Sequence, residues 1–412
     1  MKILLVTMPF ADEKTMTGEK FVMNEATAYC LGLAYLHSYL ESQGHCVVTK
    51  GMNYYSVPDA IAEIDLVAPK LDIIGISVLT FNRMSSFALI EHMHEKYPGV
   101  RIILGGIHAT WMYEQILKKY PYVVVVRGEG EITFTELAAS TSPDLHTVNG
   151  IAFHDGNQVV LTAPRALITD LDTIPFPNHD YWQHNTERSA ANVITSRGCP
   201  SKCSFCCLNP TAGTKVRFRS IKNTVDEIEY IARTYPNVKT IQFCDDAFFT
   251  RPSRVIEMCD EIVRRKIKMK FICQARAKPC SREIALALDR AGFYMITVGM
   301  ETGDPTVLKN TGKNITLDDI LHMYECFKGT RVKLYMLQIV GLHGETWQSI
   351  ENSGKFIQKT QMLQYNYYPF PNIAMVFPGT ELYRNMVAAG ILTDDYWLGD
   401  GITPPYTVEH SY

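Results

Sequence analysis

Three cysteines lie close together in one short stretch, Thr195-Ser196-Arg197-Gly198-Cys199-Pro200-Ser201-Lys202-Cys203-Ser204-Phe205-Cys206. Thiolates at this spacing can converge on one soft metal centre. A closed structural zinc site prefers four protein ligands, commonly in two close pairs, and here three cysteines are in register. Cys207 is the near fourth cysteine, but adjacent cysteines rarely point at the same centre. The stretch therefore predicts a cubane cluster with one open iron, and a zinc knuckle or buried thiols are the alternative.

The cysteine loop follows a strand-like segment directly, and strand-like and helix-like segments alternate along the chain after it. Six such units in about 200 residues are too few for a complete eight-unit barrel, which needs about 250. We therefore expect an open (β/α)6 partial TIM barrel over residues 191–390, with the cysteine loop at the carboxyl end of its first strand. The expected strands are Asn192–Ser196, Thr240–Phe243, Lys270–Gln274, Met295–Gly299, Lys333–Val340 and Asn372–Val376, and helices between them include Thr224–Thr234, Ser281–Ala291 and Thr346–Thr360.

Residues 1–140 show the same alternation and are expected to form a separate domain. Apolar strands alternating with helices indicate a parallel sheet covered on both faces, here a flavodoxin-like doubly wound sheet. Residues 141–190 are expected to hold a hairpin and a proline-rich connector, and residues 391–412 a tail without a clear pattern. The expected strands are Ile3–Thr7, Cys46–Val48, Ile73–Leu79, Ile102–Leu104 and Val123–Val126, and the helices include Leu31–Ser42 and Ser85–Tyr97.

The composition limits the classes of partner. The chain has 412 residues, and its net charge of −3 argues against a nucleic-acid partner, which would call for a basic face. No stretch approaches the roughly 20 apolar residues of a membrane span, and the first apolar run is too short for a secretion signal. We therefore expect a cytoplasmic protein without a membrane partner, whose 11 cysteines stay reduced unless a metal binds them.

The Cys199-x3-Cys203-x2-Cys206 spacing resembles the radical S-adenosylmethionine (radical SAM) superfamily, in which an aromatic residue such as Phe205 usually precedes the last cysteine. The resemblance implies that the three cysteines hold a 4Fe–4S cluster whose open iron binds S-adenosylmethionine. It implies that one electron from the cluster cleaves a carbon–sulfur bond, usually giving a 5′-deoxyadenosyl radical, while the protein keeps water and oxygen out. A small-molecule substrate and an electron donor such as flavodoxin or ferredoxin are also implied.

The later barrel strands end in polar residues that resemble this family's cofactor-binding segments. Asp245 and Asp246 can accept hydrogen bonds from the ammonium or ribose of the cofactor, although a helix cap also needs such residues. Arg276 matches a carboxylate, or lies on the surface. Glu301, between two glycines, can bind the amino group or ribose, or belongs to a tight turn. The candidate cofactor contacts of the barrel are Phe205, Asp245, Asp246, Gln274, Arg276, Glu301, Gln338 and Val340.

The first domain resembles the cobalamin-binding domain that is fused to many radical SAM enzymes. Ligands of such sheets bind at the carboxyl ends of the strands, where glycines let the backbone approach a large flat cofactor. Mutases with this domain supply a histidine to cobalt after the first strand, whereas Met8–Lys14 has none, as in the radical methylases. His108 suits a hydrogen bond better than a metal bond. The candidate cobalamin contacts are Leu79, Thr80, Gly105, Gly106, His108, Gly128 and Glu129.

Three functions remain open from the sequence. The leading hypothesis is cobalamin-dependent methyl transfer to an unactivated carbon or phosphorus of a small molecule. The second is a cobalamin-independent radical SAM rearrangement, dehydration or carbon–heteroatom bond formation, including use of the 3-amino-3-carboxypropyl fragment. The third is a non-catalytic iron–sulfur or zinc protein. Bound cobalamin separates the first two hypotheses, and cleavage of S-adenosylmethionine excludes the third.

Overall fold

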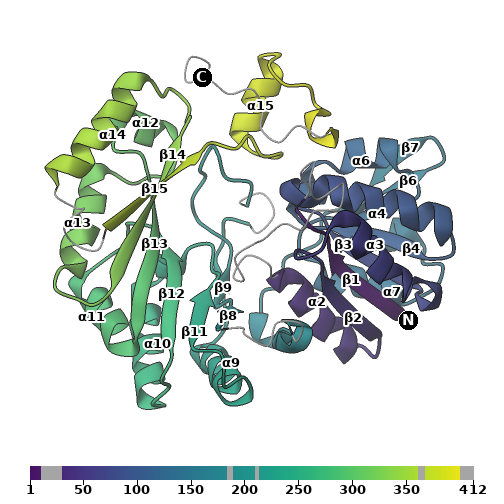
Figure 1. Ribbon diagram of the computed structural model, residues 1–412, viewed down its shortest axis with the longest axis horizontal. Helices are drawn as coiled ribbons and strands as arrows, with labels where there is room; N and C mark the ends of the chain where they lie inside the picture. The colour runs from purple at the N-terminus through teal and green to yellow at the C-terminus, as the bar shows by residue number, and fades with distance from the viewer. Residues whose placement is uncertain (11–29, 183–188, 209–212, 361–366, 400–412) are drawn as a thin grey trace. The chain divides into compact units, whose positions relative to one another are not determined.

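The computed structural model describes residues 1–10, 30–182, 189–208, 213–360 and 367–399 (Figure 1). The chain forms two compact units. Unit 1 comprises Met1–Thr169, Thr173–Thr186 and Gly390–Ile402, and unit 2 comprises Asp170–Asp172, Glu187–Ala389 and Thr403–Tyr412. The chain therefore returns to unit 1 at Gly390, after the strands and helices of unit 2.

Unit 1 is built on one seven-stranded sheet in the order β2-β1-β3-β4-β5-β6-β7. The first five strands are parallel, and their order is that of flavodoxin-like doubly wound sheets, which confirms the predicted fold class. The predicted hairpin, β6 and β7, extends the same sheet with antiparallel pairing. The strands are β1 Lys2–Thr7, β2 Cys46–Gly51, β3 Ile73–Ser77, β4 Arg101–Gly105, β5 Val124–Val126, β6 Ile151–Asp155 and β7 Gln158–Leu161.

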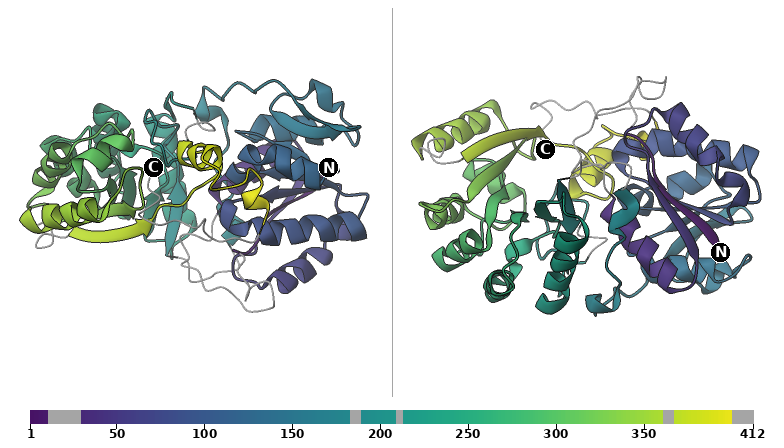
Figure 2. Two further views of the ribbon diagram at one scale, coloured as in Figure 1. Left: turned by 90° about the horizontal axis from the view of Figure 1, so that it is seen from above. Right: turned by 60° about the horizontal axis from the view of Figure 1, so that its bottom comes forward.

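Helices cover both faces of this sheet (Figures 1 and 2). On one face, Leu33 and Leu40 of α2 and Phe134 of α7 pack in one buried cluster with strand residues such as Leu5. The cluster explains why the strands read as continuous apolar runs, because each strand is buried on two sides. The helices are α2 Leu31–Ser42, α3 Val57–Asp65, α4 Arg83–Lys96, α5 Ile107–Trp111, α6 Tyr113–Lys119 and α7 Glu131–Ala138.

Unit 2 is a half barrel of six parallel strands in the order β15-β14-β13-β12-β11-β8, as predicted. A separate two-stranded ribbon pairs β9 with β10. The strands are β8 Ala190–Val193, β9 Ser196–Arg197, β10 Arg217–Phe218, β11 Thr240–Phe243, β12 Lys270–Ala275, β13 Phe293–Glu301, β14 Lys333–Val340 and β15 Tyr367–Ile373. The helices are α9 Ile221–Thr234, α10 Pro252–Arg264, α11 Arg282–Ala291, α12 Pro305–Asn310, α13 Leu317–Phe327, α14 Trp347–Lys359 and α15 Glu381–Ala388. Short 3-10 helices are η2 Ala68–Lys70, η3 Thr80–Asn82, η4 Leu145–Thr147, η5 Leu171–Thr173, η6 His179–Trp182, η7 Phe248–Thr250 and η9 Tyr396–Leu398.

The two faces of the half barrel differ in chemistry. Alternate residues of β11 and β12 join the apolar core beneath the helices, where the Phe243 ring lies 5.8 Å from Phe271 and 5.7 Å from Phe293 between centroids. Neighbouring positions such as Gln242 and Gln274 are left outside this core. The inner face of the half barrel is therefore available for polar contacts with a ligand.

The bounds of two expected barrel strands, the sixth and the first, differ most from the structure. The sixth was expected at Asn372–Val376, but β15 runs over Tyr367–Ile373 and contains Pro369 and Pro371. Prolines are tolerated on an edge strand because their missing N–H groups need no partner there, and β15 is such an edge. The first was expected to reach Ser196, but β8 ends at Val193. Among the described residues, no helix combines the length and apolar character that crossing a membrane requires.

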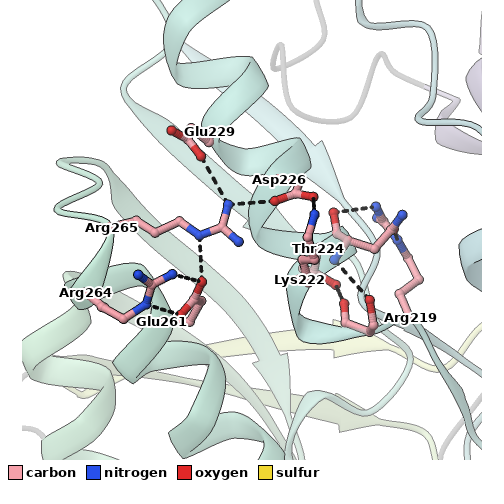
Figure 3. Close-up of polar contacts among 10 residues, drawn as sticks. Arg219, Lys222, Thr224, Asp226, Glu229, Glu261, Arg264 and Arg265 are labelled. Atoms are coloured by element: carbon pink, nitrogen blue, oxygen red, sulfur yellow. Dashed lines mark hydrogen bonds and ion pairs between the residues drawn. The ribbon is translucent and has the colours of Figure 1, made fainter.

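Charged side chains join α9 to its neighbours in unit 2. Arg265, at the end of α10, reaches Asp226 and Glu229 of α9 as well as Glu261 (Figure 3). Arg264 and Arg265 both donate to Glu261 and hold the pKa of that carboxyl at about 2.

A second ion pair of α9, between Arg219 and Glu227, is buried: their side chains are 4% and 0% exposed. Arg219 also donates Nη1 to the backbone oxygen of Ile194, 2.8 Å away, at the end of β8. This pair therefore connects the first helix of the half barrel to the start of the cysteine loop.

Replacing Glu227 with Gln removes the charge that faces the buried Arg219 guanidinium. Breaking a buried pair on one side costs about 3 kcal/mol. We expect Glu227→Gln to lower the free energy of unfolding by that amount in urea. The control, Lys222→Ala, removes an exposed ion pair with Asp226 and should change the free energy by less than about 1 kcal/mol. Equal effects of the two variants would contradict the prediction.

Unit 1 contains a buried histidine, His108, at the start of α5. Its Nδ1 lies 3.2 Å from Thr80 Oγ1, and its Nε2 has no hydrogen-bond partner among the described residues. Burial, helped by the positive charge of Arg83, lowers the pKa of His108 to about 3. The ring is therefore neutral in the folded protein at mildly acidic pH.

This lowered pKa makes stability depend on pH. The unfolded chain binds a proton at His108 below pH 6.5 and the folded chain does not until about pH 3, so stability falls as the pH falls through this window. Between pH 7 and pH 5, His108 should account for about 2 kcal/mol of lost unfolding free energy in urea. The His108→Gln variant should lack this part of the loss, whereas the exposed control His94→Gln should retain it. Identical pH dependence in both variants would refute this account.

Candidate functional site

The cysteine loop follows β8 and is held by backbone hydrogen bonds from distant parts of unit 2. The N–H of Ser204 donates to the oxygen of Thr311 over 2.9 Å, and the N–H of Leu382 donates to the oxygen of Ser204 over 3.1 Å. Within the loop, the N–H of Cys206 donates to the oxygen of Cys203 over 3.1 Å. The segment from Cys203 to Cys206 is therefore a turn, and both backbone groups of Ser204 within it are hydrogen-bonded to distant segments of unit 2.

The three thiols affect one another electrostatically. The pKa of Cys203 is raised to about 11, mainly by burial; Cys206 and Cys199 act in the same direction, and the positive charge of Lys313 opposes them. Within the part of the chain that the structure describes, no three ligating side chains are gathered around a single metal position. Three partly exposed thiols on one tied loop are a suitable donor set for a cubane cluster.

The carboxylates of Asp245 and Asp246 hold the beginning of this loop. Asp245 accepts hydrogen bonds from Thr195 N at 2.6 Å, Thr195 Oγ1 at 2.6 Å and Ser196 Oγ at 2.5 Å. Asp246 Oδ2 accepts from Gly198 N at 3.0 Å. Burial raises the pKa of both carboxyls, and the hydrogen bonds they accept act in the opposite direction. Both oxygens of Asp245 have internal donors, so its contacts favour positioning the loop over binding a ligand.

Glu301 forms a buried ion pair with Lys313, a residue that the sequence analysis does not predict as part of the site. The side chains are 7% and 8% exposed, and Lys313 Nζ also lies 2.7 Å from the oxygen of Gly299. A Cβ on Gly299 would contact both charged groups, so a larger residue there would require the flexible ends of these two side chains to shift. Lys313 therefore adds a positive charge beside Cys203 and Glu301.

The position of Lys313 depends on the preceding glycine. Gly312 has φ +67°, and a Cβ there would lie 2.8 Å from the backbone oxygen of Lys202. This close approach brings the segment after α12 against the cysteine loop. Since Lys313 does not follow a strand, its sequence position carried no signal of a role in the site.

The remaining barrel candidates lie on β12, β14 and the cysteine loop. Arg276 donates through Nη2 to the oxygen of Lys313, while its buried Nε has no partner among the described residues. Gln274 is exposed, and Phe205, Gln338 and Val340 are half-buried. A cavity of about 80 Å³ lies beside Arg276, and its lining is Pro200, Ala247, Phe249, Thr250, Arg276, Lys278 and Pro279.

The candidate residues of unit 1 lie in three turns at the carboxyl ends of β3, β4 and β5. The first two turns are tied together, because Val78 N donates to the oxygen of Gly105 over 2.8 Å. Gly106 has φ +92°, and a Cβ there would lie 2.7 Å from the oxygen of Val78. The space around the Cβ positions of Gly105 and Gly128 is open. Such a glycine-lined edge fits the close approach of a large flat ligand.

Polar contacts distinguish the other candidates of unit 1. Leu79 N donates to Asn82 Oδ1 over 2.7 Å, which closes the turn that contains Thr80. Thr80 in turn contacts His108, so both side chains are engaged inside the unit. Glu129 Oε2 accepts a hydrogen bond from Ile168 N at 3.0 Å, which favours a role in holding the segment after the hairpin.

Comparison with known proteins agrees with this two-part organisation. Residues 193–357 match the sequence model of the radical SAM superfamily, and residues 25–138 match that of the B12 binding domain. An uncharacterized methyltransferase of Pyrococcus horikoshii is 28% identical over 96% of this chain and 85% of its own length. An anaerobic magnesium-protoporphyrin IX monomethyl ester cyclase of Rubrivivax gelatinosus is 28% identical over 78% of this chain, and the match spans only 60% of the cyclase.

Solved structures share the fold. The radical S-adenosylmethionine methyltransferase TsrM from Kitasatospora setae, solved with cobalamin and a [4Fe-4S] cluster, aligns with 94% of this chain and 75% of its own. The TM-score is 0.76 at 17% sequence identity, a likeness that concerns the fold. The two domain matches and the half barrel that carries the three-cysteine loop lead to one conclusion: the chain carries a radical SAM domain over residues 193–357 and a B12-binding domain over residues 25–138.

Proposed function

We propose that this protein is a cobalamin-dependent radical SAM methyltransferase that acts on a small molecule. The observation that carries the proposal is the presence, in one chain, of a half barrel with the three-cysteine loop and a doubly wound sheet with a glycine-lined carboxyl edge. The methyltransferase relative matches 96% of the chain, so it includes both units.

In this proposal, Cys199, Cys203 and Cys206 hold the 4Fe–4S cluster, and the turns around Thr80, Gly105 and Gly128 hold cobalamin. The bound cluster supplies the electron for reductive cleavage of S-adenosylmethionine, and bound cobalamin supplies the methyl group. The protein's own contribution is to orient these groups and to exclude water around them.

The Glu301–Lys313 pair supplies both charges that an α-amino acid requires. A carboxylate accepts hydrogen bonds from an ammonium group, and a lysine ammonium donates to a carboxylate. Because the two side chains already neutralise each other, they are stable in a buried position before any ligand arrives. We propose that this pair binds the methionine part of S-adenosylmethionine, with Arg276 beside it through its contact with Lys313.

The substrate, the electron donor and the location belong to the same proposal. TsrM has been solved with tryptophan as its substrate, which supports a small molecule as the methyl acceptor here. A flavodoxin or ferredoxin is the proposed electron donor, and the cytoplasm, which is reducing, is the proposed location.

A second function is favoured by one specific observation. The cyclase of Rubrivivax gelatinosus, whose name implies ring closure, is as identical to this chain as the methyltransferase relative is. A radical SAM reaction without methyl transfer, such as a rearrangement or bond formation, is therefore the alternative. The shorter match to the cyclase, 78% of this chain against 96%, ranks it second.

The first experiment is to purify the protein without oxygen from cells supplied with iron and cobalamin. We expect iron–sulfur absorbance, about one cobalamin per chain and cleavage of S-adenosylmethionine after reduction. A methyl-labelled S-adenosylmethionine then identifies acceptors among small molecules. An iron–sulfur spectrum without cobalamin would reject methyl transfer and favour the alternative.

The cluster assignment predicts different roles for neighbouring cysteines. Replacing Cys199, Cys203 or Cys206 with Ala should abolish the 4Fe–4S signal and cleavage of S-adenosylmethionine, because the cubane loses a ligand. The matched control, Cys207→Ala, should retain both. Electron paramagnetic resonance and product analysis measure the two properties. Cleavage by any of the first three variants, or loss of the signal in the control, would contradict the assignment.

The proposed role of Lys313 predicts a binding defect. Lys313→Met leaves the buried Glu301 without its cation and removes a donor to the cofactor carboxylate, a loss of about 2 kcal/mol or more. The Kd for S-adenosylmethionine should therefore rise at least about tenfold. Lys309→Met changes an exposed lysine of α12 and should leave the Kd unaltered. If both variants bind with the wild-type Kd, Lys313 has no role in the site.

A further inference from the structure

The segment after α15 packs back onto unit 1. Leu392 and Trp397 are buried there, and the Trp397 side chain is 0% exposed. Gln115 Nε2 of α6 donates to Asp394 Oδ2 over 2.5 Å. Residues 390–399, expected from the sequence to be a tail without pattern, thus contribute side chains to the core of the first unit.

Arg83 is the main contact of this tail. Its guanidinium carbon lies 4.8 Å from the centre of the Trp397 ring, and Nε and Nη2 donate to the oxygen of Gly399 over 3.1 and 2.8 Å. Arg83 is only 5% exposed, so a cation–π contact and two carbonyl hydrogen bonds act in a desolvated place, where they are strongest.

The same guanidinium holds the turn after β3. Nη1 of Arg83 donates to the oxygen of Thr80 over 2.8 Å, and the side chain of Thr80 contacts His108. Asn82 Nδ2 donates to the oxygen of Ser77, the last residue of β3, over 3.1 Å. The turn is therefore hydrogen-bonded both to the end of β3 and to Arg83, and Arg83 is itself held by its contacts with the tail.

We infer that Arg83 and residues 390–399 are positioning elements for cobalamin: they hold the Thr80 turn in the conformation that binds the corrin. The inference rests on the proposed function, because it takes this edge of unit 1 as the cobalamin site. If the tail contact is lost, the turn samples other conformations, and the apparent Kd rises as the inverse of the fraction of molecules whose turn is still competent to bind. A competent fraction of about one tenth corresponds to a tenfold rise in Kd.

The test uses the full chain, freed of cobalamin and titrated with hydroxocobalamin under absorbance detection. We expect Arg83→Met to raise the Kd about tenfold or more without changing the iron content. The matched control, Lys119→Met, removes a cation 5.0 Å from the Tyr120 ring in the same unit and should bind as the wild type does. A Kd for Arg83→Met equal to that of the control would overturn the inference.

Two further measurements keep the test decisive. Gln115→Ala changes a side chain that contacts the tail only near the surface, so it should fold normally and still raise the Kd by about twofold or more. Hydrogen exchange of residues 78–83 in cobalamin-free protein should be faster in Arg83→Met than in Lys119→Met. If the wild type binds no cobalamin, the proposed function fails, and the exchange rates alone decide whether the tail holds the turn. Equal exchange rates would reject that contact.

Discussion

The buried carboxylate of Asp245 is the constraint on which the geometry of the cysteine loop depends. It ties the end of β11 to the first residues of the loop through three hydrogen bonds of 2.5 to 2.6 Å. Arg254 adds a second layer, because it donates to Thr195 Oγ1 over 3.1 Å and to the oxygen of Arg219 over 2.8 Å. Since Arg219 is paired with Glu227, the loop is connected to α9 as well as to two strands. The thiols therefore start from a rigid support.

The sequence predicts those features that local pattern determines. Five of the barrel strands and the five parallel strands of unit 1 are found because each is an apolar run between turn residues. Contacts across the chain do not leave such a pattern. The sequence places Asp245 at a strand end, and its role as a cofactor contact stays a prediction; what the sequence does not reveal is that Asp245 accepts hydrogen bonds from donors about 50 residues earlier. The sequence also does not predict a role for Lys313, because Lys313 reaches the site through a contact between distant segments. Gly312 packs against the backbone of the cysteine loop and so brings Lys313 beside it.

The tail illustrates the same limit in unit 1. Trp397 lies in a short segment between Tyr396 and Leu398, and neither a helical nor a strand period marks it as buried. Trp397 is buried through its contact with Arg83, a residue that lies more than 300 positions earlier in the chain. The strand β15 is also hard to predict from its sequence because it contains prolines. They are tolerated because β15 lies at the edge of the sheet, and that position depends on the whole sheet and not on the segment.

Charges inside both units are already satisfied before a ligand binds. Asp245 has internal donors, Glu301 has Lys313, and Arg83 has two carbonyl oxygens and an aromatic ring. Such groups hold the loops, and they need little rearrangement when a cofactor arrives. The open positions are instead the glycine-lined turns of unit 1 and the inner barrel face around Gln274. Under the proposed function, we therefore expect the substrate to contact this inner face, because its exposed side chains take no part in these internal contacts.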